Sequence, residues 1–199
     1  MERITIVGHS FVPRLQNFIQ GDPDVNDNFD LVNTTVEFFG RGGLTLNRLG
    51  ELKARICGSG QADWAIMILG DNDIGSYDGP RRVAEEILRA SEKVKSWTGA
   101  AKVVIFAMFP RFWKPGHDYF LPDYNEQATA VNNCLRELVD NDRGLFVWSP
   151  DKLAVNNRKA DRYFDCEGRN GGVHLNDPGN FLLYRSIKRA LGVLKQVSI

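Results

Sequence analysis

The sequence has few cysteines, no net charge and no long apolar run, and each of these absences excludes a class of protein. Three widely spaced cysteines among 199 residues, Cys57, Cys134 and Cys166, indicate neither a disulfide framework nor a zinc site. We therefore expect reduced thiols and a cytoplasmic protein. The 25 basic and 25 acidic side chains balance, which argues against strong electrostatic binding to nucleic acid or to an anionic membrane.

The apolar segments are too short for a membrane protein. No run approaches the length that spans a bilayer, and the strand-like segment Arg3–Val7 is too short for the core of a secretory signal. Hydrophobic residues make up 43% of the chain and charged residues 25%, which is ordinary for a globular protein. We expect one domain over residues 1–199 with a sizeable core and no membrane partner. The composition leaves the oligomeric state open.

Short β-rich runs alternate with helical segments along the chain. Most of these runs are continuously apolar, as parallel strands buried on both faces are, whereas the second is more mixed and is expected at an edge. The alternation predicts an α/β fold with a doubly wound parallel sheet. The five runs are Ile4–Val7, Val32–Phe39, Trp64–Leu69, Val103–Met108 and Leu145–Trp148.

Apolar residues at helical spacing predict three long helices, with shorter ones after Ser10 and Gly43. Pro80 suits the first turn of the first long helix, and Asp177 is expected to cap the last. The long helices cover Pro80–Trp97, about Asn125–Val139 and about Pro178–Leu194.

Four short polar motifs follow the predicted strands or precede the last helix. They supply a hydroxyl, glycine N–H groups, a side-chain amide and an imidazole, which are the groups that an ester-hydrolysing site needs. Because the carboxyl ends of parallel strands share one edge of a sheet, we expect these groups to meet there. The motifs are Gly8-His9-Ser10-Phe11, Arg41-Gly42-Gly43, Gly70-Asp71-Asn72-Asp73 and Val173-His174-Leu175-Asn176.

Ser10 follows the first buried strand and precedes a helix. Backbone N–H groups and the helix dipole at such a position stabilise a developing negative charge, which makes Ser10 a candidate nucleophile. The other interpretation is a helix-capping serine, which is common at helix starts. His9 is adjacent to Ser10, but neighbouring side chains usually diverge, so it is not assigned as the base.

The remaining candidates also have two interpretations each. Gly43 can present a bare N–H to a ligand, or it belongs to an ordinary glycine loop. The amide of Asn72 can donate to an oxyanion or close an Asx turn. His174 is either a general base or a hydrogen-bonded loop histidine. His117, in the aromatic loop 111–123, has no motif partner and is interpreted as structural or substrate-facing.

The order of the motifs resembles that of the SGNH hydrolases, also called GDSL-like esterases and lipases. The resemblance extends from Ile4 to about Leu191, includes Phe109-Pro110-Arg111 and Tyr124-Asn125, and looks like a GHSF-type variant. It implies a three-layer α/β/α, flavodoxin-like fold with five parallel strands in the order 2-1-3-4-5. It also implies one SGNH hydrolase-like domain over residues 1–199.

The resemblance further implies roles for the candidate residues. Ser10 is then the nucleophile and His174 the base, and the N–H groups of Ser10 and Gly43 form an oxyanion hole with the side chain of Asn72. Family members are mostly metal-independent, so neither a metal nor a cofactor is expected. The implied substrate is a small ester with an acetyl or another short acyl group. GHSF-type variants also look like domains of animal mobile-element proteins.

Two positions depart from the pattern of the family. His9 replaces an aspartate that usually has a supporting role. More seriously, Gly171 occupies the place of the acid in Asp-x-x-His, and that acid orients the imidazole and stabilises the imidazolium. Its replacement is either a backbone carbonyl or one of the nearby carboxylates of Asp161, Asp165 and Glu167.

The missing acid leads to two expectations. The pKa of His174 is expected nearer to the unperturbed value of about 6.5 than in an intact triad. The variant Gly171→Asp is expected to hydrolyse esters faster, provided that Gly171 does not need a positive φ.

The resulting hypothesis is a serine esterase that works with a Ser10–His174 dyad. Two alternatives stay open, because the acid is missing. One is a ligand-binding module that keeps the pocket without turnover, and the other is an interaction domain of a larger, mobile-element-encoded protein.

Overall fold

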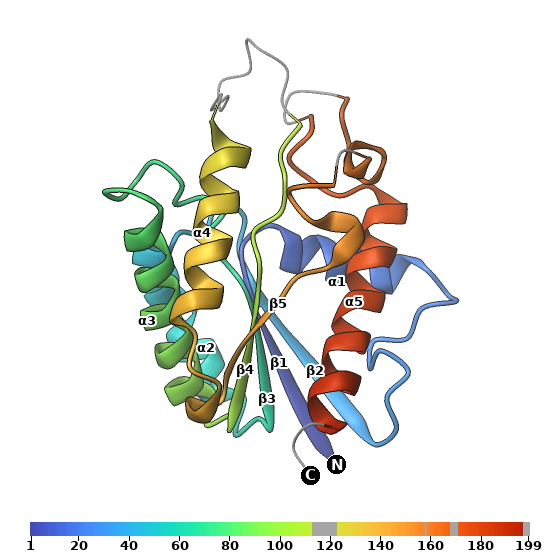
Figure 1. The fold of residues 1–199 in the computed structure, drawn as a ribbon. Coiled ribbons are helices and arrows are strands. Elements are labelled where there is room, and N and C mark those ends of the chain that lie inside the picture. The colour runs from blue at the N-terminus through green and yellow to red at the C-terminus, as the bar shows by residue number, and fades with distance from the viewer. Residues whose placement is uncertain (113–122, 158, 168–170, 197–199) are drawn as a thin grey trace.

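The fold is built on a single parallel sheet, which the computed structural model describes for residues 1–112, 123–157, 159–167 and 171–196. The strand order is β2-β1-β3-β4-β5, and all neighbouring pairs are parallel. The predicted α/β fold and strand order are thus confirmed, with the mixed second strand at an edge (Figure 1). The strands are β1 Glu2–Gly8, β2 Thr34–Gly40, β3 Trp64–Ile68, β4 Lys102–Phe106 and β5 Leu145–Trp148.

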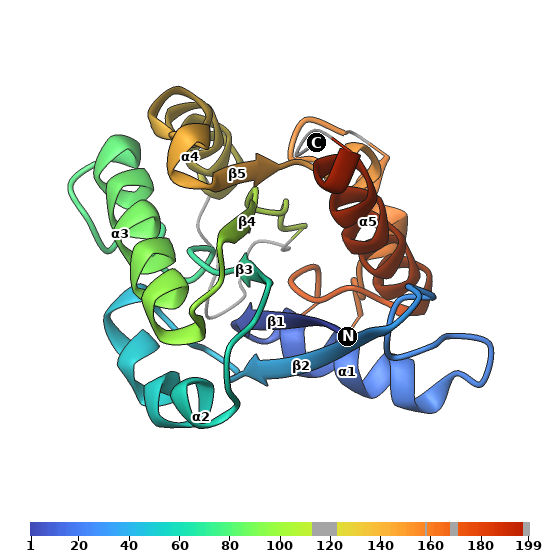
Figure 2. The same cartoon turned by 90° about the horizontal axis from the view of Figure 1, so that it is seen from below.

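Helices cover both faces of this sheet and make it the middle of three layers (Figure 2). α1 and α5 lie on one face, and α2, α3 and α4 lie on the other. The helices are α1 Phe11–Gly21, α2 Lys53–Gly58, α3 Pro80–Thr98, α4 Tyr124–Leu138 and α5 Asp177–Gln196. The described 3-10 helices cover Leu46–Leu52, Asn141–Arg143, Asp151–Leu153 and Ala160–Tyr163.

Two hydrophobic cores lie on opposite faces of the sheet. Successive side chains of a strand point to opposite faces, so Ile6 packs with α1 and α5 whereas Val7 packs with α3 and α4. Both side chains are fully buried. This burial on both faces is the reason that the central strands have continuously apolar sequences.

The starts of β2 and of the last helix differ from the sequence prediction for reasons that the structure shows. β2 begins at Thr34 and not at Val32, because Val32 is exposed and Asn33 has a φ of 53°, which does not fit a strand. The prediction that Asp177 caps the last helix is wrong, since Asp177 is its first helical residue. The cap is Asn176, whose side-chain oxygen accepts a hydrogen bond from Gly179 N at 3.0 Å.

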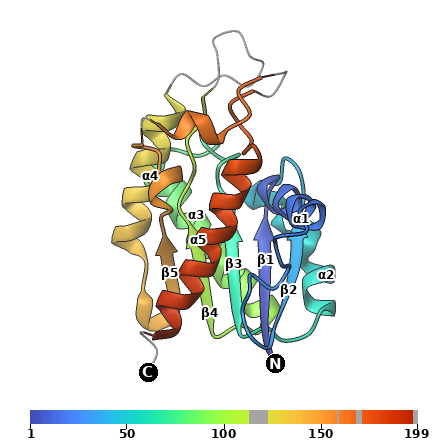
Figure 3. The same cartoon turned by 90° about the vertical axis from the view of Figure 1, so that its right-hand side faces the viewer.

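The carboxyl ends of all five strands lie at one edge of the sheet, the upper edge in Figures 1 and 3. The segments that follow β1, β2, β3 and β4 all leave from this edge and carry most of the polar motifs. Within the described residues, none of the helices combines the length and the apolar character that crossing a bilayer requires. His117 lies outside the described residues.

Candidate active site

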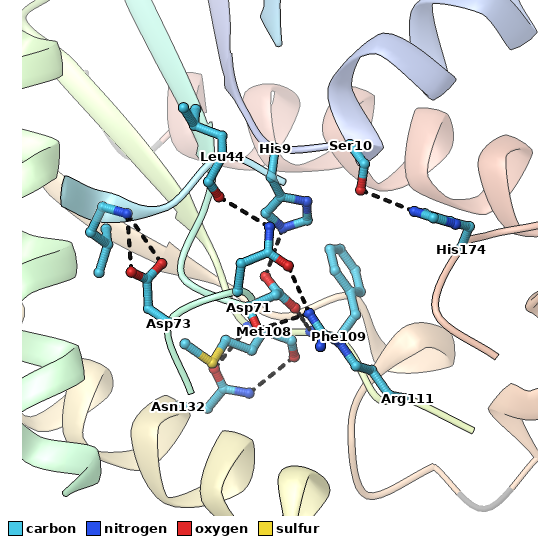
Figure 4. A network of polar contacts seen from close by, with 12 residues as sticks. His9, Ser10, Leu44, Asp71, Asp73, Met108, Phe109, Arg111, Asn132 and His174 are labelled. Atoms are coloured by element: carbon cyan, nitrogen blue, oxygen red, sulfur yellow. Dashed lines mark hydrogen bonds and ion pairs between the residues drawn. The ribbon is translucent and has the colours of Figure 1, made fainter. Parts of the chain in front are cut away.

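Ser10 and His174 lie together at the carboxyl edge of the sheet. The Nε2 atom of His174 is 3.2 Å from the Oγ atom of Ser10, although the two residues are 164 positions apart in the sequence (Figure 4). This distance permits a proton to pass from the hydroxyl to the imidazole.

The backbone around Ser10 directs its hydroxyl toward the imidazole. Ser10 occupies the N-cap position of α1, but its side chain makes no capping hydrogen bond, so the capping interpretation does not describe it. Gly8, at the end of β1, lies so close to β3 that an added Cβ would be 2.1 Å from the carbonyl oxygen of Ile68. A glycine is therefore required for the close approach that places Ser10 at the sheet edge.

A short antiparallel bridge holds the loop of His174. Phe164 pairs with Leu175, and Asp165 N donates a hydrogen bond to the carbonyl oxygen of His174 at 2.8 Å. The ring of Phe11 packs edge-on against the imidazole, with the centroids 6.4 Å apart. These contacts fix the imidazole beside the start of α1.

The amide of Asn72 is held at both ends. Its Nδ2 donates to the carbonyl oxygen of Leu44 at 3.0 Å, and its Oδ1 accepts a hydrogen bond from Arg111 Nη2 at 3.0 Å. The amide nitrogen has two hydrogens, so one N–H remains after the bond to Leu44. This arrangement is not an Asx turn, and it determines which end of the amide is the donor.

Gly43 lies next to Leu44, the residue that Asn72 contacts. Its φ of +64° is in the left-handed region, where glycine is favoured, and its N–H has no acceptor among the described residues. Gly43 is exposed and does not line the small pocket beside Ser10, which Ser10, Asn72 and Arg111 do line.

His9 and Asp71, the chain neighbours of Ser10 and Asn72, form a buried pair (Figure 4). The Nε2 atom of His9 is 2.9 Å from Asp71 Oδ2, and both side chains are almost completely buried. Asp71 also accepts hydrogen bonds from Phe109 N and from the hydroxyl of Tyr124, each at 3.1 Å. Burial alone raises the pKa of Asp71, but His9 and Arg111 more than offset this and lower it.

Arg111 is held by its backbone as well as by its side chain. Asn125 of α4 accepts a hydrogen bond from Arg111 N and donates one to Arg111 O, both at 2.9 Å. The guanidinium donates to the carbonyl oxygen of Asp71 at 2.8 Å and lies 4.3 Å from the ring centroid of Tyr124. Asn132 contacts both backbone polar groups of Met108 in the same manner. α4 therefore positions Met108 and Arg111 in the segment that follows β4.

Asp73 fixes the segment after β2 from the other side. Its carboxylate accepts a bifurcated hydrogen bond from Leu46 N at 3.1 and 3.2 Å. Burial is the main reason that the pKa of Asp73 is raised to about 7. The nearby Asp71 also raises this pKa, whereas the hydrogen bond from Leu46 N lowers it. Asn72 and Asp73 together hold both ends of the short segment from Leu44 to Leu46.

The surroundings of His174 disfavour its charged form. Burial is the largest cause and lowers the pKa of His174 to about 4, with further lowering by Arg14, His9 and Arg111, while Asp165 raises it. The expectation of a pKa near 6.5 is therefore wrong. The sequence could not show the burial of this loop, nor the arginines that converge on it from α1 and from the segment after β4.

None of the three candidate acids, Asp161, Asp165 and Glu167, forms a hydrogen bond with the imidazole of His174. Among the described residues, that imidazole has Ser10 as its only hydrogen-bond partner. Asp165 is exposed, and its Oδ1 accepts a hydrogen bond from Glu167 N at 3.3 Å. Glu167 is exposed as well. Asp165 thus acts on His174 through its charge and through its backbone N–H.

No group of three or more histidine, cysteine, aspartate or glutamate side chains that could hold a metal ion occurs in the part of the chain that the structure describes.

Comparisons with known proteins identify the fold. No protein-family model and no curated protein sequence matches the chain. A member of the lipolytic protein G-D-S-L family from Veillonella parvula has a TM-score of 0.65 at 16% identity, over 95% of this chain and 97% of its own. A GDSL-like lipase from Bacteroides thetaiotaomicron has a TM-score of 0.66 at 15% identity, over 97% and 89%. This chain has the fold of the GDSL-like hydrolases.

A third solved structure supports the same conclusion. An acetyl xylan esterase has a TM-score of 0.63 at 16% identity, over 94% of this chain and 98% of its own. The resemblance to SGNH, or GDSL-like, hydrolases is thus confirmed at the level of the fold, over nearly the whole chain.

Within this GDSL-like fold, sequence reasoning missed the roles of Arg111 and Asp71 and the partner of His9. Each contact joins residues more than 35 positions apart, and no local spacing connects them. The sequence offered one signal for these contacts. The motifs Phe109-Pro110-Arg111 and Tyr124-Asn125 belong to the family resemblance, but no role was assigned to them.

Proposed function

We propose that this protein is a serine esterase that hydrolyses small carboxylic esters. The observation that carries the proposal is the 3.2 Å contact between Ser10 Oγ and His174 Nε2, at an edge of the sheet where Asn72 presents an amide N–H. The fold of ester hydrolases supports the same reaction class.

In the proposed reaction, His174 Nε2 takes the proton of Ser10 as the Ser10 oxygen attacks the carbonyl carbon. The resulting oxyanion is stabilised by the N–H groups of Ser10 and Gly43 and by the free N–H of Asn72. When the carbon–oxygen bond to the alcohol breaks, His174 returns the proton to the leaving oxygen. A water molecule, activated by the same imidazole, then cleaves the acyl-enzyme.

The pocket beside Ser10 supports an acetyl group as the acyl part. Its volume is about 10 Å³, which is room for roughly one water-sized group, and a methyl group is of this size. Phe11, Pro110 and Val173 are among the residues that line it. Longer acyl chains need a displacement of these side chains.

The test combines labelling with hydrolysis. We expect a fluorophosphonate probe to label wild-type protein and not Ser10→Ala, and we expect ethyl acetate hydrolysis to need both Ser10 and His174. The double variant Ser10→Ala/His174→Ala is expected to lose little more than either single variant, because the two residues act as one unit. Unchanged hydrolysis by Ser10→Ala would exclude the proposal.

A second candidate function follows from the imidazole of His174. With a pKa lowered to about 4 and no carboxylate bonded to it among the described residues, His174 is a weak base. This favours a catalytically attenuated, ligand-binding domain as the alternative. A folded protein that neither reacts with the probe nor hydrolyses esters of several chain lengths would support it.

A further inference from the structure

The buried pair of His9 and Asp71 is hard to explain by stability alone. Both side chains are almost completely buried, and the second ring nitrogen of His9, Nδ1, is buried without a hydrogen-bond partner among the described residues. A buried ion pair seldom stabilises a fold more than apolar side chains of the same size would, and an unpaired buried polar atom lowers the stability. The pair therefore needs an explanation other than the free energy of unfolding.

The pair joins the two segments that carry the nucleophile and the amide of the oxyanion hole. His9 precedes Ser10 at the end of β1, and Asp71 precedes Asn72 after β3. The 2.9 Å contact between His9 Nε2 and Asp71 Oδ2 spans 62 positions of the sequence (Figure 4). Each partner is thus one residue away from a group that acts on the carbonyl of the ester in the proposed reaction.

The sheet does not fix the distance between these two segments. The last backbone hydrogen bond between them runs from His9 N to the carbonyl oxygen of Ile68 at 3.1 Å. Beyond it, the contact of His9 with Asp71 is the only hydrogen bond between segments 9–11 and 70–73 that the described part of the chain shows. Ser10 and Asn72 follow this contact, so their spacing depends on it.

The other partners of Asp71 set the direction of the contact. Its Oδ1 accepts hydrogen bonds from Phe109 N and from the hydroxyl of Tyr124, which leaves Oδ2 for His9. An ionised carboxylate only accepts hydrogen bonds, and the lowered pKa of Asp71 keeps it ionised at neutral pH. His9 Nε2 is therefore the donor. Asp71 is held from β4 and α4, and it holds the start of α1 through His9.

His9 and Asp71 also belong to the wall of the small pocket. Both line it together with Ser10 and Asn72, and its volume is about 10 Å³. A space of this size tolerates little displacement of either segment. A shift of about 1 Å between reacting groups can lower a rate by roughly 10², so a contact that fixes the spacing has a direct effect on catalysis.

We infer that His9 and Asp71 are positioning residues, and that their hydrogen bond fixes the distance between the hydroxyl of Ser10 and the amide of Asn72. This inference rests on the proposed esterase function. Neither residue acts on the substrate itself, because each acts through the residue that follows it in the chain. The contact works through its geometry, so any pair of side chains that keeps a hydrogen bond between positions 9 and 71 preserves the activity.

The first experiment varies the reach of the side chain at position 9. His9→Gln and His9→Asn carry the same amide and differ by one methylene group, and only the longer side chain extends as far as the imidazole Nε2. We expect His9→Asn to lower kcat for ethyl acetate by at least about tenfold with little change in KM, because the oxyanion forms only in the transition state. We expect His9→Gln to have a kcat close to that of the wild type.

The second experiment separates geometry from charge at position 71. In Asp71→Asn the amide oxygen still accepts from Phe109 N and Tyr124. The amide nitrogen donates to His9 Nε2 once the imidazole carries its hydrogen on Nδ1. We expect this variant to keep most of kcat and Asp71→Ala to lose it. Equal losses in Asp71→Asn and Asp71→Ala would show that charge decides, and would overturn a positioning role.

A core variant controls for lost stability. Leu135 is fully buried on the opposite face of the sheet, and Leu135→Ala lowers the stability by leaving a cavity. At a temperature where circular dichroism shows every variant folded, Leu135→Ala is expected to keep the kcat of the wild type. A loss of kcat in Leu135→Ala that equals the loss in His9→Asn would mean that the pair acts through stability, and would overturn the inference.

Inhibition by methylboronic acid gives a second readout. This compound forms a tetrahedral adduct with a serine hydroxyl, and we expect its inhibition constant to rise in His9→Asn by the same factor by which kcat/KM falls. A wild type that hydrolyses ethyl acetate, together with unchanged kcat in His9→Asn, would overturn the positioning role and leave the esterase intact. A folded wild type without turnover would contradict the proposed function, and the positioning role with it.

Discussion

A Cβ atom on Gly171 would lie 2.7 Å from the carbonyl oxygen of Cys166. It would also be 2.9 Å from the carbonyl carbon of Cys166 and 3.2 Å from the carbonyl oxygen of Glu167. Gly171 does not have a positive φ, so the condition that we set from the sequence is met. The obstacle is backbone that passes too close for any side chain. The loop that carries His174 therefore leaves no room for a side chain at position 171, where the family has its acid.

The close backbone therefore reverses the expectation that Gly171→Asp hydrolyses esters faster. We predict that Gly171→Asp lowers the melting temperature and does not speed ester hydrolysis, and that Gly171→Ala lowers the melting temperature as well, because the clash begins at Cβ. Thermal unfolding and ethyl acetate hydrolysis check this. Gly50→Asp is the control, since nothing lies within 4 Å of a Cβ there. Wild-type stability with faster hydrolysis in Gly171→Asp would contradict the prediction.

The pH dependence of catalysis follows from the lowered pKa of His174. A general base must be neutral, so kcat/KM is expected to rise with pH through about 4 and to be level above about 5. Removing the positive charge of Arg14 by Arg14→Gln shifts this rise to higher pH, and Asp165→Asn shifts it to lower pH. Profiles of kcat/KM for ethyl acetate measure both shifts. A rise centred near 6.5 in the wild type would show that the imidazole is not in the environment described.

The hydrogen bond from Arg111 to Asn72 assigns a positioning role to Arg111. Asn72→Ala is expected to lower kcat by roughly 10²–10³, the usual scale for one oxyanion donor. We predict that Arg111→Met also lowers kcat, but has much less effect in the Asn72→Ala background, because Arg111 acts through the amide. Steady-state kinetics of the two single variants and the double variant measure this coupling. Additive losses in kcat would mean that Arg111 acts independently of Asn72.

The buried pair of His9 and Asp71 explains why the aspartate of the family is absent before Ser10. The variant His9→Asp places a second carboxylate beside a buried one, and breaking a buried pair costs about 3–5 kcal/mol. We predict a loss of this size in the free energy of unfolding, measured with urea. His9→Asp/Asp71→Asn removes the repulsion and is expected to recover part of the stability. If His9→Asp is as stable as the wild type, the pair of His9 and Asp71 contributes nothing to the free energy of unfolding.

The sequence by itself determined the architecture, because the signals for it are local. Strands such as Ile4–Val7 are apolar on both faces, the helices carry apolar stripes, and Pro80 and Gly99 bound α3 as predicted. A parallel sheet brings the carboxyl ends of its strands to one edge, so the meeting of Ser10 with Asn72 could be expected from the positions of the motifs. His174 was found through the order of the motifs.

Only the tertiary structure decided what surrounds these residues. The pairing of His9 with Asp71 and the support of Asn72 by Arg111 join segments that are far apart in the sequence, so no local pattern encodes their distance. The same holds for the pKa of His174, which depends on burial and on charges from several elements. Local patterns specify elements, whereas the electrostatics and the shape of a site depend on how those elements pack.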